Sequence, residues 1–117
     1  IFITHDLSLL VEISDTLAIM YAGKIVEYGA SESLFNRPLH PYTKGLMNSF
    51  PSLTGMIKRM GGIEGKPPDL LKPPEGCRFH PRCPQAIPIC RESCPSLEEI
   101  ADRHSVACFL HKGAEIL

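Results

Sequence analysis

The stretch GCRFHPRCPQAIPICRESC, residues 76–94, holds four of the five cysteines of this chain of 117 residues, and the fifth is Cys108. All eleven prolines lie between residues 38 and 95, so this part of the chain is expected to contain much irregular structure. A small proline-rich segment needs a staple to stay folded. The cysteines therefore decide how the second half of the chain folds.

Three kinds of cross-link between cysteines could hold this segment together: disulfides, a zinc ion or an iron–sulfur cluster. An odd number of cysteines fits a complete disulfide framework poorly, and disulfides would have to survive a reducing compartment. A structural zinc ion would take four thiolates, or three with a histidine such as His80 or His104, but zinc sites favour CysXXCys pairs and the sequence has none. An iron–sulfur cubane is larger than one ion and accepts thiolates from wider loops. The spacing alone leaves zinc and an iron–sulfur cluster as equal alternatives.

The charge and hydropathy of the chain limit its partners. Its formal net charge is −1, whereas nucleic-acid-binding domains usually carry a basic excess, so no nucleic-acid partner is predicted. No signal peptide, lipidation motif or membrane-spanning apolar run is recognised, which predicts a chain that is soluble by itself. The sequence begins at Ile1 without methionine, in an apolar run that suggests a fragment of a longer protein.

The first thirty residues predict a strand, a short helix and a β-hairpin. Residues 1–3 form the apolar run, and residues 7–13 predict a helix with Asp6 as its N-cap. This order places His5 at the carboxyl end of a strand, where open α/β sheets bind ligands; a surface histidine in a strand-to-helix turn is the plainer alternative. The hairpin is predicted from two apolar runs that flank a tight turn at Gly23.

The middle of the chain predicts short helices and then a connector. One helix is expected to begin near Ser31 and to end before Pro38. A second is expected over residues 40–49, with Pro41 in its first turn. Residues 61–76 are rich in proline and glycine, and they predict an extended connector that leads into the cysteine-rich segment.

The end of the chain predicts one more helix and one strand. Ser96 and Glu99 fit a capping box, which predicts a helix that runs through about Arg103. Residues 105–110 then predict a strand that returns Cys108 toward the other cysteines.

Four segments resemble one protein family, the ATP-binding subunits of bacterial and archaeal ABC importers for oligopeptides and dipeptides. The last of the four is typical of the peptide-importer branch, and VAC at 106–108 extends the likeness almost to the end of the chain. The segments are FITHDL at 2–7, MYAGKIVEYG at 20–29, RPLHPYTKGL at 37–46 and PPEGCRFHPRCPQA at 73–86.

The resemblance implies an α+β fold in three parts. Residues 1–30 would be the C-terminal end of an ABC-type nucleotide-binding domain, made of a strand, a short helix and a β-hairpin. Residues 31–60 would be a helical connection. Residues 61–117 would be a C-terminal extension whose proline-rich cysteine loop is stapled by a metal cluster.

The resemblance also implies a role for His5, the switch histidine that contacts the γ-phosphate of ATP and helps position the attacking water. Phosphoryl transfer depends mainly on such positioned hydrogen-bond donors and charges. The sequence contains no phosphate loop, no strand that ends in AspGlu and no signature segment. The fragment alone is therefore expected not to hydrolyse ATP, and ATP with Mg²⁺ would bind only in the full-length parent.

For the extension, the resemblance implies a 4Fe-4S cluster held by Cys77, Cys83, Cys90 and Cys108, with zinc as the alternative metal. A structural role for the cluster is expected, ahead of a redox-sensing role. Cys94 departs from the family pattern and is interpreted as a spare thiol, although its closeness to Cys90 leaves an exchange of ligands open.

The parent protein implied by the resemblance couples ATP hydrolysis to the uptake of oligopeptides or dipeptides. It would lie in the cytoplasm, peripheral on the inner face of the cell membrane, and would work with transmembrane permease subunits and a second ATP-binding subunit. A zinc-stapled protein-interaction module without an ATPase role is the alternative function. The exposed edge strands of a fragment are also expected to allow a non-physiological dimer.

Overall fold

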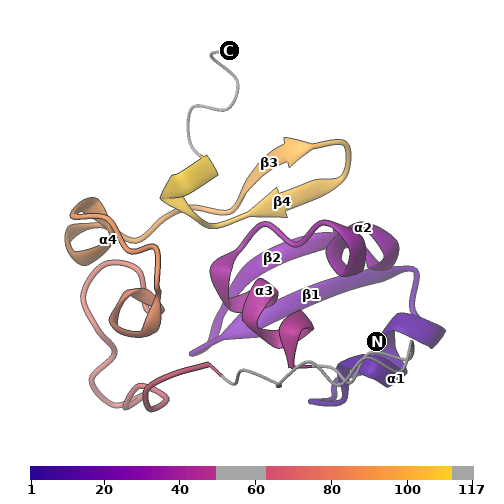
Figure 1. Ribbon diagram of the computed structural model, residues 1–117, viewed down its shortest axis with the longest axis horizontal. Helices are drawn as coiled ribbons and strands as arrows, with labels where there is room; N and C mark the ends of the chain where they lie inside the picture. Colours follow the sequence, from indigo (N-terminus) through magenta and orange to yellow (C-terminus); the bar gives the residue numbers. More distant parts are fainter. Residues whose placement is uncertain (50–62, 112–117) are drawn as a thin grey trace.

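The computed structural model describes residues 1–49 and 63–111, which form a small α+β fold, as predicted (Figure 1). The predicted domain boundary at residues 60 and 61 lies outside the described residues. Within them, no helix is both long and apolar enough to cross a bilayer. The elements follow in the order α1 (Leu7–Ile13), β1 (Thr16–Tyr21), β2 (Lys24–Ala30), α2 (Ser31–Asn36), α3 (Pro41–Asn48), η1 (His80–Arg82), α4 (Ile89–Glu92), β3 (Glu98–Ala101), β4 (His104–Val106) and η2 (Phe109–His111), where η marks a 3-10 helix.

One antiparallel sheet contains both the hairpin near the N-terminus and the hairpin near the C-terminus. Its strand order is β1-β2-β4-β3, so the C-terminal hairpin pairs with the N-terminal one through β2 and β4 (Figure 1). Gly29 of β2 faces His104 of β4 in this register. A Cβ at Gly29 would lie 2.9 Å from the carbonyl oxygen of Arg103 and 2.9 Å from Cδ1 of Leu34, so only glycine permits this close approach. The cysteine-rich extension therefore shares its sheet with the first hairpin.

The predicted hairpin over β1 and β2 is confirmed. Its two turn residues, Ala22 and Gly23, have φ angles of 49° and 80°, as a two-residue turn of type I′ requires. In β1, alternate side chains are buried and exposed, which places Leu17, Ile19 and Tyr21 on the inner face. Burying each of these side chains stabilises the fold by about 1.5–3 kcal/mol.

The N-terminal helix is confirmed, but the strand predicted before it is wrong. The carboxylate of Asp6 accepts a hydrogen bond from the backbone N–H of Leu9 at 3.3 Å and so caps α1. That carboxylate also accepts from the Ser8 hydroxyl, and these bonds lower its pKa, the Ser8 bond most of all. Residues 1–3 are not part of a strand, because an apolar run forms a strand only where a neighbouring strand satisfies its backbone, and no described segment pairs with it.

The helix predicted through Arg103 is also wrong, since this segment forms the hairpin of β3 and β4. The Ser96 hydroxyl donates to Oε1 of Glu98 at 2.7 Å, and Oε1 of Glu99 accepts from the backbone N–H of Arg103 at 2.8 Å. Neither side chain therefore caps a helix: Ser96 bonds to the start of β3, and Glu99 bonds to the turn between β3 and β4. The strand predicted over residues 105–110 ends early, at Val106.

The helices α2 and α3 begin close to where the sequence predicts them, and residues 63–76 contain no helix or strand, as expected of the connector. The core that these helices cover contains one residue from the cysteine-rich segment, Phe79, which is 2% exposed. Its ring lies edge-on to Tyr21 at 5.1 Å and is tilted against Tyr42 at 5.5 Å. The cysteine-rich segment is thus anchored to the first half of the chain by an aromatic side chain.

Candidate metal centre

Four cysteines, three from the cysteine-rich stretch and one from the end of the described chain, line one small cavity. Cys77 and Cys83 flank η1, Cys90 lies in α4, and Cys108 precedes η2. All are free thiols, and Cys90 is the most deeply buried of them. The structure therefore brings together the four residues that the family resemblance names, while their role as metal ligands stays a prediction.

A glycine allows two of the cysteine segments to lie against each other. The backbone N–H of Cys77 donates to the carbonyl oxygen of Cys90 at 2.8 Å. A Cβ on Gly76 would lie 2.4 Å from that same oxygen, and the φ of Gly76 is 71°, in the left-handed region. Both the contact and the dihedral angle exclude a side chain at this position. Gly76 is thus the residue that lets Cys77 and Cys90 reach the same cavity.

The electrostatics of the cavity favour neutral thiols when no metal is bound. Burial raises the pKa of the Cys77, Cys83 and Cys108 thiols, because a thiolate is poorly solvated there. Neighbouring cysteines raise the pKa further. For Cys108, the effect of Cys83 is the largest, followed by those of Cys77 and Cys90. Thiolates repel one another in this way only when their sulfurs are close together. A cation bound in the cavity would instead lower the pKa of the thiols.

Backbone N–H groups oppose this effect at three of the sulfurs. The N–H groups of Phe79 and His80 lower the pKa of the Cys77 thiol, and the N–H groups of Gln85 and Leu110 do the same for Cys83 and Cys108. Hydrogen bonds from the backbone to a sulfur stabilise its thiolate form and tune any metal bound to it. The chain thus supplies donors where a thiolate-bound metal would need them.

The donor set fits a thiolate-bound metal group. Four thiols, with N–H donors to three of them, are the ligand type that a 4Fe-4S cluster takes, and a cluster holds its thiolates farther apart than one ion does. A four-thiolate zinc ion would need the same side chains closer together than they lie here. Across residues 1–49 and 63–111, no three His, Cys, Asp or Glu side chains are grouped so as to hold a single metal ion.

The remaining candidate ligands have other contacts. Cys94 is exposed and lines a different cavity, with its Sγ 3.9 Å from the carbonyl oxygen of Pro95. His104 is buried, and its Nε2 lies 2.6 Å from Oε1 of Glu27. His80 lines the cysteine cavity, but its Nδ1 is bonded to the carbonyl oxygen of Cys77 at 2.8 Å.

Sequence reasoning missed a buried carboxylate, Glu27, that contacts His40 in the lining of the cysteine cavity. Glu27 of β2 is 0% exposed, and its oxygens accept from the backbone N–H of Leu39 at 2.8 Å, the backbone N–H of His40 at 3.0 Å and Nε2 of His104 at 2.6 Å. It therefore joins β2, the segment before α3 and β4. The only signal in the sequence was an acidic residue inside an otherwise apolar strand.

His40 connects that carboxylate to the cysteine cavity. Its backbone N–H donates to Glu27, its ring is 1% exposed, and it lines the cavity beside Phe79. Burial lowers the pKa of His40 to about 4, although Glu27 acts in the opposite direction. The neutral ring accepts the backbone N–H of Tyr42 at Nδ1, at 3.0 Å, and so caps α3. In the sequence, the only indication of this role is that His40 directly precedes a proline.

His5 lies well away from the cysteines. It is exposed and directly precedes Asp6, at the start of α1, whereas the cysteines gather around α4 on the opposite side of the molecule (Figure 1). The described residues contain no phosphate-binding loop beside it. Its role as a switch histidine stays a prediction.

Comparisons with known proteins agree on one group of relatives. Residues 26–90 match the family model described as the oligopeptide/dipeptide transporter, C-terminal region. The chain is 43% identical over 112 residues to the dipeptide transport ATP-binding protein DppD of Caldanaerobacter subterraneus, covering 96% of this chain and 34% of that protein. It is 47% identical over 109 residues to the oligopeptide transport ATP-binding protein OppD of Escherichia coli, covering 93% and 32%. The chain thus spans about a third of the length of the curated relatives it matches.

Proposed function

The chain belongs to the family of oligopeptide/dipeptide transporter C-terminal regions, and we propose that it is the C-terminal part of the ATP-binding subunit of a peptide ABC importer. The observation that carries this proposal is the extent of the similarity to such subunits, which covers 93–96% of the chain in two of the relatives. The similarity thus includes both the first hairpin and most of the extension. The whole subunit would couple ATP hydrolysis to the uptake of oligopeptides or dipeptides.

In the whole subunit, His5 would contact the γ-phosphate of ATP and help position the attacking water. The side chain is exposed and is held at the start of a capped helix, so it is open to a ligand. ATP and Mg²⁺ would be bound by parts of the subunit outside this chain. Permease subunits in the membrane and a second ATP-binding subunit would be its partners, on the cytoplasmic face of the membrane.

We assign a structural 4Fe-4S cluster to Cys77, Cys83, Cys90 and Cys108. Bound there, the cluster would supply four iron–thiolate bonds that cross-link three loops. Two of these cysteines flank the segment that contains Phe79, whose ring fills the core between Tyr21 and Tyr42. Holding the cysteines therefore holds the aromatic anchor, which supports a structural role for the metal.

The role of His5 is tested in the full-length subunit assembled with its permease. A His5→Ala substitution is expected to lower the kcat of ATP hydrolysis by on the order of a hundredfold, because a donor to the transition state is lost. The matched control is Glu12→Gln, an exposed position in α1, the helix that follows His5. If His5→Ala hydrolyses ATP as fast as that control, the proposed role of His5 is wrong.

The metal site is tested separately on this chain by substituting single cysteines. A Cys83→Ser substitution is expected to abolish binding of the metal, whereas Cys94→Ser is expected to leave the metal content unchanged, since Cys94 lies outside the cysteine cavity. Equal loss of metal in both variants would refute the ligand assignment without affecting the proposed role of His5.

A further inference from the structure

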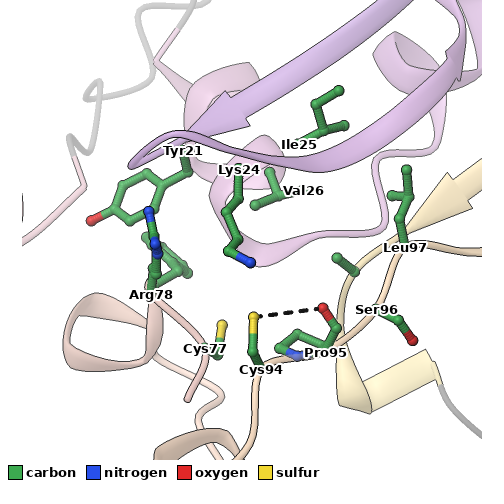
Figure 2. Close-up of a pocket in the computed structure, with 12 residues that line it drawn as sticks. Tyr21, Lys24, Ile25, Val26, Cys77, Arg78, Cys94, Pro95, Ser96 and Leu97 are labelled. Atoms are coloured by element: carbon green, nitrogen blue, oxygen red, sulfur yellow. Dashed lines mark hydrogen bonds between the residues drawn. The ribbon is translucent and has the colours of Figure 1, made fainter. Parts of the chain in front are cut away.

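A second cavity, of about 370 Å³, opens between the turn of the first hairpin and the extension (Figure 2). Residues from β2, from the Cys77–Phe79 segment and from residues 94–97 line it. It is distinct from the cysteine cavity, although Cys77 and Phe79 contribute to both. Its volume falls in the range of sites that bind small molecules.

Two cations from different parts of the chain face this cavity. Among the residues that the structure describes, Lys24 and Arg78 are the only charged side chains that line it, and no carboxylate does. Figure 2 shows the Lys24 ammonium extending from β2 into the space between Arg78 and Cys94. In the described part of the chain, neither cation forms an ion pair. The cavity therefore has a positive potential that nothing in its own lining neutralises.

The guanidinium of Arg78 is held in place by the hairpin turn. Its Nη1 donates to the carbonyl oxygen of Ala22, the turn residue that precedes Gly23. Guanidinium has five N–H donors in a planar fork, and no other acceptor within the described ranges takes those that remain. Arg78 is thus fixed in position with donors still available to a ligand.

The floor of the cavity is apolar. It includes Tyr21, Val26, Phe79 and Ala107, each of which is no more than 7% exposed. These side chains belong to the packed interior of the fold or lie beside it. The exposed apolar surface of the lining comes from Ile25 and Leu97, which are 41% and 43% exposed.

We propose that this cavity binds a small organic carboxylate with an apolar side chain. The carboxylate would pair with the Arg78 fork and the Lys24 ammonium, since a fork of N–H donors matches the two oxygens of a carboxylate. The apolar side chain would pack on Ile25 and Leu97, the exposed apolar side chains of the lining. An inorganic anion would use the two cations and leave these apolar side chains in contact with water, so the combination of features selects an organic ligand.

The proposal is tested by calorimetric titration of the metal-loaded chain with N-acetyl-leucine. Its neutral isostere N-acetyl-leucinamide and the small anion acetate are titrated in parallel. N-acetyl-leucine is expected to bind with a Kd of about 1 mM or lower and at least tenfold more tightly than either comparison ligand. Equal affinity for the acid and the amide would overturn the proposal, as would an absence of saturable binding.

Two substitutions locate the binding in this cavity. Lys24→Gln is expected to weaken binding of N-acetyl-leucine about tenfold, because one charge-assisted contact is lost. Lys72→Gln removes an exposed lysine that does not line the cavity, and its affinity is expected to match the wild type. Unchanged affinity in Lys24→Gln, or an equal loss in both variants, would contradict the proposed site.

Discussion

Replacing Glu27 is expected to destabilise the protein more than any exposed substitution, because its buried carboxylate satisfies three donors at once. Oε1 accepts from the backbone N–H of Leu39 and from Nε2 of His104, and Oε2 accepts from the backbone N–H of His40. In Glu27→Gln the shape is retained, but an NH₂ group replaces one oxygen. With the amide oxygen at the Oε1 position, the NH₂ group faces the His40 N–H, and neither donor has an acceptor.

The size of each effect follows from the number of donors that lose their partner. A buried donor without an acceptor costs about 1–3 kcal/mol, so Glu27→Gln is expected to lower the free energy of unfolding by about 2 kcal/mol. In Glu27→Ala all three donors lose their acceptor and a small cavity is left, for which a loss of about 4 kcal/mol is expected. That loss is a large fraction of the total stability of a small domain.

Urea unfolding followed by circular dichroism measures these differences, with the exposed Glu12→Gln as a control that should remain within about 0.5 kcal/mol of the wild type. A second comparison uses His104→Ala alone and combined with Glu27→Ala. Since the two side chains are in contact, their effects should not add. The reasoning is refuted if both Glu27 variants unfold at the urea concentration of the control, or if the double variant shows simple additivity.

Two further predictions concern His40 and Gly76. The pKa of His40 falls from 6.5 in the unfolded chain to about 4 in the folded one, so the stability from its neutral form is present above pH 6.5 and is lost as the pH falls toward 4. His40→Asn keeps an acceptor at the N-cap of α3. Lowering the pH from 7 to 4 should reduce the free energy of unfolding of the wild type by about 3 kcal/mol more than that of this variant. A difference between the two proteins that stays constant with pH would contradict this. Gly76→Ala places a Cβ against the carbonyl oxygen of Cys90 and should lower both stability, by about 2 kcal/mol, and metal content, measured by urea unfolding and metal analysis. Wild-type values of both in Gly76→Ala would show that the two cysteine segments are not packed as described.

Elements that depend on local signals could be predicted from the sequence. The cap of α1 at Asp6 and the turn at Gly23 are formed by residues within a few positions of each other, and both are confirmed. The starts of α2 and α3 follow from Ser31 and Pro41 in the same way. In each case the residues that define the element are also its neighbours in space.

The errors occur where distant parts of the chain decide the conformation. Ser96 and Glu99 satisfy a local capping pattern, yet residues 98–101 form β3, which pairs with β4, and β4 in turn pairs with β2. This pairing overrides the local preference. Glu27 could not be recognised as a buried hub because its three donors come from residues 12, 13 and 77 positions away. The cysteine spacing likewise did not distinguish zinc from an iron–sulfur cluster, and the family resemblance supplied the ligand set.

Whether Cys77, Cys83, Cys90 and Cys108 bind an iron–sulfur cluster is decided by measuring iron, acid-labile sulfide and zinc per chain after anaerobic purification. About four irons and an equal amount of sulfide per chain are expected, as a cubane cluster requires, with zinc absent. One zinc per chain without sulfide would contradict the cluster assignment and would favour a plain structural zinc site at the same cysteines.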